Sequence, residues 1–140
     1  MFNRILAPLD LQDTTGTDQT LAALKALTGE SSHVVLLTVM PDIRMPLVAS
    51  YFPKGSLEKA VDALTQSLNK KAADSLKGYN VSCVVAVGDA QEQIVKTAER
   101  EQVDLILMKA YQHGSLDKLM LGSVTAKVVE RSPCSVFVLK

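Results

Sequence analysis

Three places along the chain carry groups that could contact a ligand. Asp10 directly follows the apolar residues 6–9 and offers a carboxylate. Lys109 ends another apolar run with an amine, which could hold a phosphate or pair with Asp10. Gly122 and Ser123 end a loop before a segment of helical period, and the free N–H groups at a helix start can bind an anion. These residues are the candidate site.

Each of these residues also has a purely structural interpretation. Asp10 can cap the turn or the following helix, and Lys109 can reach solvent from the end of a strand. For Gly122 and Ser123, a plain helix start with Ser123 as the N-cap is the simpler interpretation. The residue types alone therefore leave both interpretations open.

The histidines and the short sequence motifs give no evidence for catalysis or metal binding. His113 lies in a loop and has no Asp, Ser or Cys at the spacing of a catalytic triad or a metal site, which favours a solvated histidine. His33 is predicted at the surface before the second strand, and Asp89 is predicted to cap a helix. The sequence contains neither a GxxxxGKS/T nor a GxGxxG motif. We therefore expect no catalytic or metal centre.

The composition is that of one ordinary globular domain, which we expect to span residues 1–140. The chain is 47% hydrophobic and balances 15 Lys and Arg against 15 Asp and Glu, so it lacks the charge that binds nucleic acid or an anionic membrane. No window is apolar over the ~18 residues that a membrane span needs. Cys83 and Cys134 lie in apolar runs, and no signal peptide precedes them, so we expect reduced thiols in a cytoplasmic protein.

Apolar runs of five to seven residues alternate with segments of helical period, which is typical of an α/β fold with a parallel sheet. The predicted strands are residues 4–9, 33–39, 80–87, 104–109 and 135–139, and the predicted helices are 18–27, 56–77, 90–101 and 123–131. Ser56 is predicted as the N-cap of the second helix. Ligands of such folds bind beyond the carboxyl ends of the strands. Asp10 and Lys109 lie at such ends.

One connection, residues 40–55, is long and lacks a clear period. Its apolar content, including Tyr51 and Phe52, is too high for a solvated linker. Loops of this length are usually functional or disordered. We expect a lid or a contact loop.

Five segments of the chain resemble the universal stress protein family, and together they extend over the whole sequence. They are FNRILAPLD at 2–10, GDA with QIV at 88–95, VDLILM at 103–108, LGSV at 121–124 and SPCSVFV at 132–138. The resemblance implies a five-stranded parallel sheet in the order 3-2-1-4-5 with helices on both faces. It also implies a homodimer through the last strand, Ser135–Leu139, an apolar edge that invites pairing.

Nucleotide-binding members of that family carry a glycine loop: Gly, two residues, Gly, nine residues, then Gly followed by Ser or Thr. Aligned on Gly122 and Ser123, the two earlier glycines fall on Lys109 and Gln112. Glycines let a loop hold phosphates with backbone N–H groups, and these side chains would fill that space. The family's other ATP contacts fall on Asp10 and on the backbone of Val39, which remain compatible.

Three functions follow as hypotheses. The first is a non-catalytic, homodimeric stress-response regulatory or interaction protein that binds ATP weakly or not at all. The second is an ATP-binding protein, with Mg²⁺ and slow hydrolysis, that uses Asp10, Val39, Gly122 and Ser123. The third is a module that binds a small apolar ligand or a partner through residues 40–55. The substituted glycine loop favours the first.

Overall fold

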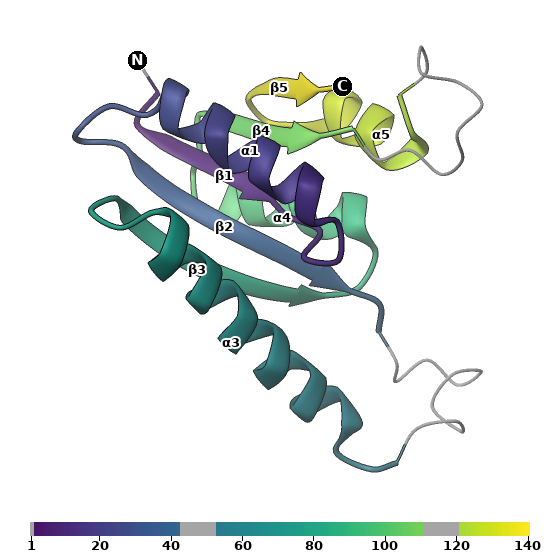
Figure 1. Ribbon diagram of the computed structural model, residues 1–140. Helices are drawn as coiled ribbons and strands as arrows, with labels where there is room; N and C mark the ends of the chain where they lie inside the picture. The colour runs from purple at the N-terminus through teal and green to yellow at the C-terminus, as the bar shows by residue number, and fades with distance from the viewer. Residues whose placement is uncertain (1, 43–52, 111–120) are drawn as a thin grey trace.

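The computed structural model describes residues 2–42, 53–110 and 121–140 and shows helices packed on both faces of a central sheet (Figure 1). Strands and helices alternate along these residues as the sequence predicts. In chain order they are β1 (Arg4–Pro8), α1 (Thr14–Leu27), β2 (His33–Met40), α3 (Ser56–Ser75), β3 (Asn80–Val87), α4 (Ala90–Arg100), β4 (Leu105–Lys109), α5 (Ser123–Arg131) and β5 (Ser135–Leu139).

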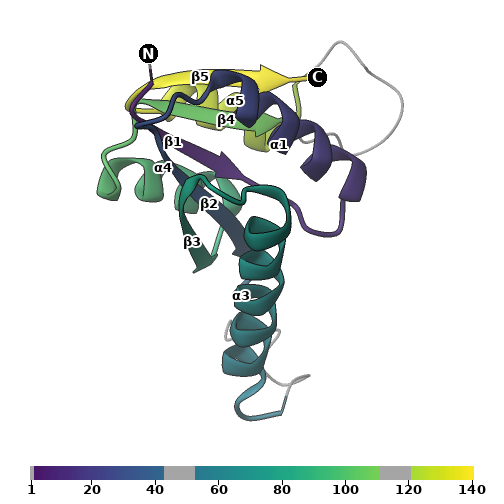
Figure 2. The ribbon, with the colours of Figure 1, turned by 60° about the vertical axis from the view of Figure 1, so that its left-hand side comes forward.

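The five strands form one sheet in the order β3-β2-β1-β4-β5, and every neighbouring pair is parallel. The predicted fold class and strand order are confirmed. Helices α1 and α3 lie on one face and α4 and α5 on the other, as the two views show (Figures 1 and 2). The chain builds outward from β1 to β3 and then returns to place β4 on the other side of β1. The carboxyl ends of β1, β2 and β4 therefore lie near the switch in strand order.

Strand β2 shows how the two layers are held together. Val34 and Leu36 pack into the core beneath α1 and α3, while Val35 and Leu37 pack into the core beneath α4 and α5. All four side chains are fully buried. A strand buried on both faces needs apolar residues at successive positions rather than alternating ones. This explains the continuous apolar run of β2.

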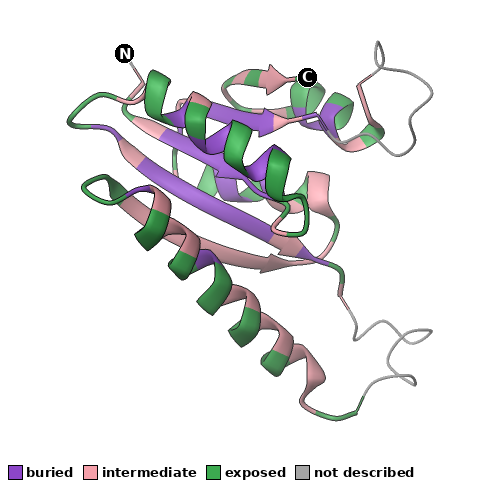
Figure 3. Ribbon diagram, in the orientation of Figure 1, coloured by how far each residue is buried: buried purple, intermediate pink, exposed green. Residues whose placement is uncertain are grey.

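Burial falls from the centre of the sheet to its edges (Figure 3). Strands β1, β2 and β4 are largely buried, whereas β3 and β5 are mostly half-buried or exposed. Each of the last two pairs with a single neighbour within the described residues. In the same part of the chain, no helix is long and apolar enough to cross a membrane.

Helix α1 begins at Thr14, four residues earlier than predicted, which corrects the predicted start at residue 18. Asp13 is its N-cap, and the Asp13 carboxylate accepts a hydrogen bond of 2.9 Å from the Gly16 N–H. Such a cap satisfies one of the free donors of the first turn. The connection after β1 is correspondingly short. The start of α1 therefore lies close to Asp10.

The predicted caps of two other helices are wrong by one residue. Gly55, with a φ of 86°, is the N-cap of α3, and Ser56 is the first helical residue. Gly122 likewise is the N-cap of α5, and Ser123 follows it inside the helix. Neither glycine has a side chain that could cap, so the first N–H groups of both helices receive no side-chain cap.

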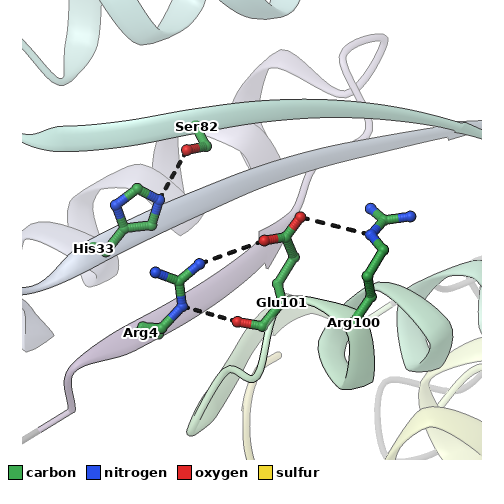
Figure 4. Close-up of polar contacts among 5 residues, drawn as sticks. All are labelled: Arg4, His33, Ser82, Arg100 and Glu101. Carbon is green, nitrogen blue, oxygen red and sulfur yellow. Dashed lines mark hydrogen bonds and ion pairs between the residues drawn. The ribbon is translucent and has the colours of Figure 1, made fainter.

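Near the amino ends of the strands, one group of polar contacts joins β1 to the end of α4, and a separate hydrogen bond joins β2 to β3 (Figure 4). Arg4 of β1 donates 2.8 Å to the Glu101 backbone carbonyl and lies 3.4 Å from the Glu101 carboxylate, which Arg100 approaches at 3.6 Å. His33 is the first residue of β2, half-buried, and shares a 2.8 Å hydrogen bond with Ser82 of β3. His33 is therefore partly exposed, and it begins β2 rather than preceding the strand.

Candidate ligand-binding site

A pocket of about 270 Å³ opens at the carboxyl ends of β1 and β2. Its lining comes from four places: the end of β1, the end of β2, the middle of α3 and the start of α4. The described lining residues are Leu9, Asp10, Leu11, Gln12, Thr38, Val39, Met40, Pro41, Leu64 and Ala90. Apolar side chains dominate, with one carboxylate and no cationic group among these ten. Pockets of this kind typically bind small molecules.

Asp10 combines both of the interpretations that the sequence left open. Its carboxylate accepts a 3.0 Å hydrogen bond from the Gln12 N–H, which closes a turn. Its backbone carbonyl accepts the Thr17 hydroxyl at 2.8 Å, which ties the turn to α1. The side chain is nevertheless exposed and lines the pocket. The turn therefore orients the carboxylate at the rim of the pocket.

The backbone of Val39 faces the same pocket. The Leu37 carbonyl accepts the N–H of Leu9, from the β1 side, at 2.7 Å, whereas the Met40 carbonyl accepts the Gly88 N–H from the β3 side. The N–H and C=O groups of successive residues in a strand point to opposite edges of the strand. The N–H and C=O groups of Val39 therefore point to the β1 side, as the Leu37 carbonyl does. The pairing with β1 ends at Leu37. The polar groups of Val39 are therefore directed to the gap where β1 has ended.

Lys109 does not pair with Asp10. Its amine donates a 2.7 Å hydrogen bond to the backbone carbonyl of Lys140, just beyond β5. The register explains this, because Lys109 lies opposite Leu139. The expectation that this amine points into the crevice is corrected. The cation instead holds the end of the last strand.

Gly122 and Ser123 lie at the N-terminus of α5 and are not among the described residues that line the pocket. Ser123 is exposed. The predictions for Gln112 and His113, and most of the predicted contact loop at residues 40–55, fall outside the described residues. Within that loop, Met40 belongs to β2, and Met40 and Pro41 line the pocket.

The structure adds Thr38, Gln12 and Leu64 to the residues that the sequence singled out. Thr38 had a visible signal, because it is the one hydroxyl-bearing residue in the apolar run of β2. Leu64 had none, since its helical stripe marks it only as a core residue. No group of three or more His, Cys, Asp or Glu side chains in the described ranges could hold a metal ion.

Both cysteines are free thiols, Cys83 on β3 and Cys134 just before β5, at opposite edges of the sheet. Burial raises the pKa of the Cys83 thiol above its ordinary value. The Cys83 sulfur lies 3.9 Å from the Leu68 carbonyl of α3, which the thiol can contact as a weak donor.

We predict that Cys83 makes the protein less stable at alkaline pH. With its folded pKa raised, the thiol keeps its proton in a range where the unfolded chain has released it. The free energy of unfolding should therefore fall as the pH rises through the ordinary thiol range. Urea unfolding at pH 7 to 10 measures this slope. Cys83→Ala, which keeps Cys134, should lose this part of the slope, and an unchanged slope would contradict the prediction.

The model of the universal stress protein family matches residues 1–140 of the chain. The chain belongs to the universal stress protein family. Among the curated relatives, the universal stress protein of Methanothermobacter thermautotrophicus is 35% identical over 151 residues, with 100% of this chain and 97% of the relative covered. Universal stress protein MJ0577 of Methanocaldococcus jannaschii is 29% identical over 157 residues, with 100% and 96% covered.

Solved structures of other universal stress proteins share the fold. The structure of protein MJ0577 superposes with a TM-score of 0.76 at 30% identity and covers 100% of this chain and 96% of its own. A universal stress protein solved in complex with cAMP gives a TM-score of 0.67 at 16% identity, with 99% and 96% covered. A third, from Archaeoglobus fulgidus in complex with dAMP, gives 0.63 at 15%, with 99% and 98% covered. At such low identities the last two support the fold alone.

Proposed function

We propose that this chain is a non-catalytic, homodimeric regulatory or interaction protein of the stress response. We propose further that its single domain covers residues 1–140 and that it binds ATP weakly or not at all. The observation that carries the proposal is the position of Lys109. The side chain of Lys109 stands where the glycine loop of nucleotide-binding family members has its first glycine. The Lys109 amine donates to the Lys140 carbonyl and is therefore not free to bind a phosphate. The free thiols Cys83 and Cys134 support a cytoplasmic location.

The described pocket lining supports weak binding of a triphosphate. Asp10 is its one charged side chain, and a carboxylate repels the phosphates of ATP unless a metal ion intervenes. Its volume of about 270 Å³ lies below the ~300–1,000 Å³ of pockets for drug-sized ligands. These features suit a nucleoside better than a nucleoside triphosphate.

We expect Mg-ATP to bind no more tightly than high micromolar, which corresponds to roughly 5 to 6 kcal/mol at most. Isothermal titration calorimetry gives the dissociation constant directly, and a thermal-shift titration supports it. A ligand present at 100 times its dissociation constant stabilises a protein by about 2.7 kcal/mol. Micromolar or tighter ATP would contradict weak binding.

A second candidate is an ATP-binding protein that uses Asp10, the Val39 backbone, Gly122 and Ser123. The exposed carboxylate of Asp10 and the direction of the Val39 backbone support it. The calorimetric titration with Mg-ATP distinguishes this candidate from the first.

The proposed dimer uses the outer edge of β5. In the described part of the chain β5 pairs with β4 alone, so its other edge keeps unpaired N–H and C=O groups. Phe137 on this strand is 44% exposed, and Val129 on the adjoining α5 is 46% exposed. Apolar side chains exposed near an open edge favour pairing with a second copy about a two-fold axis.

A further inference from the structure

Thr38 is a largely buried polar residue that lines the pocket, and its side chain has no partner within the described residues. It is 5% exposed and lines the pocket from β2. Among the described residues, its hydroxyl makes no hydrogen bond. By contrast, the hydroxyls of the buried Thr17 and Thr20 each donate 2.8 Å to a backbone carbonyl. The hydroxyl is not among the fully buried side-chain atoms that lack a partner, so the small exposed part of Thr38 leaves this hydroxyl open to the pocket.

The direction of the Thr38 side chain follows from the alternation of β2. Val34 and Leu36 pack against the core beneath α1 and α3, and Thr38 continues that face of the strand. Two other pocket residues lie on the same side: Leu9 belongs to that core, and Leu64 comes from α3. The Thr38 side chain therefore lies on the side of the pocket formed by Leu9 and Leu64.

We propose that Thr38 is a specificity-determining residue whose hydroxyl hydrogen-bonds the nucleoside part of the ligand. This inference takes the class of ligand, an adenine nucleoside or nucleotide, from the proposed function. It does not depend on how tightly that ligand binds. A hydroxyl both donates and accepts, so it can bond an amine, a ring nitrogen or a sugar hydroxyl. The Thr38 hydroxyl contacts the nucleoside and not the phosphates, so its loss should weaken adenosine and Mg-ATP alike.

The Thr38 hydroxyl bonds no other described group in the free protein, so its removal breaks no hydrogen bond there, and it forms one only when a ligand pairs with it. Removing the hydroxyl at constant shape, as Thr38→Val does, should therefore spare the stability of the free protein and lower its affinity for the ligand. The melting temperature of the free protein should stay equal or rise. The affinity for adenosine should fall about three- to tenfold, the range of one neutral hydrogen bond.

Thr20→Val is the matched control. Thr20 is equally buried at 1% exposed, does not line the pocket, and its hydroxyl is bonded to the Gly16 carbonyl in α1. The control variant should melt at a lower temperature than the wild type and bind adenosine with unchanged affinity. The pair thus separates a lost ligand contact from a general loss of packing.

The experiment titrates adenosine and Mg-ATP into wild type, Thr38→Val and Thr20→Val by calorimetry, up to millimolar ligand, and records their melting temperatures. Both ligands should weaken by the same factor in Thr38→Val. Unchanged affinity in that variant, or no adenosine binding by the wild type, would overturn the role of Thr38. Tight Mg-ATP binding that still depends on Thr38 would overturn the proposed weak binding of ATP and keep the role of Thr38.

Discussion

Val138→Asp is expected to fold with clearly lower stability, whereas Phe137→Asp should keep its stability and convert a dimer to a monomer. The two residues are neighbours on β5 but point to opposite faces of the sheet. Val138 lies opposite Met108 and packs against the core beneath α4 and α5. Val138 is half-buried, so a carboxylate there should lower the free energy of unfolding by roughly 1–3 kcal/mol, a substantial share of the ~5–15 kcal/mol that stabilises a domain.

Phe137 is 44% exposed, so a charge at this position meets solvent in the monomer and apolar surface only in the proposed interface. Urea unfolding measures the stability of each variant, and light scattering at micromolar concentration measures its mass. A wild-type monomer, or a Phe137→Asp variant that stays dimeric, would refute the proposed interface. A stable Val138→Asp variant would show that the packing of β5 is misassigned.

The double change Lys109→Gly with Gln112→Gly is expected to strengthen ATP binding by at least tenfold, about 1.4 kcal/mol. The double change restores two glycines of the loop that nucleotide-binding members of the family carry. The same change removes the four-carbon side chain of Lys109 and the amide side chain of Gln112. It also removes the 2.7 Å hydrogen bond from the Lys109 amine to the Lys140 carbonyl. The melting temperature should fall only slightly, because this hydrogen bond is exposed to solvent and contributes little to stability.

Lys109→Met is the control for this prediction, because it keeps the length of the side chain and removes the amine. It should lose the same contact to Lys140 and gain no ATP affinity. Calorimetry with Mg-ATP on the wild type and both variants tests this. If the double variant binds ATP no better than the wild type, the loop is not what limits binding. If Lys109→Met alone gains as much, the charge and not the bulk is responsible.

The candidate site was only partly predictable from its residues. Asp10 could be placed because it follows a strand at once, and strand ends in a parallel sheet share one edge. Lys109 ends a strand in the same way, yet its amine lies at the Lys140 carbonyl, 31 residues further along the chain. A long flexible side chain goes where its partner is, and that partner is set by the register of β4 with β5. No local pattern contains this information.

The sequence by itself determined the α/β alternation, because apolar periodicity records whether a segment is buried as a strand or as one face of a helix. The resemblance of its motifs supplied the strand order. Only the tertiary structure decided which ends meet in a pocket, and that Thr38, one polar residue in an apolar strand, lies there beside Leu64 of α3. Such contacts join segments distant in the chain, and they depend on how the helices pack across the sheet rather than on any property of one segment.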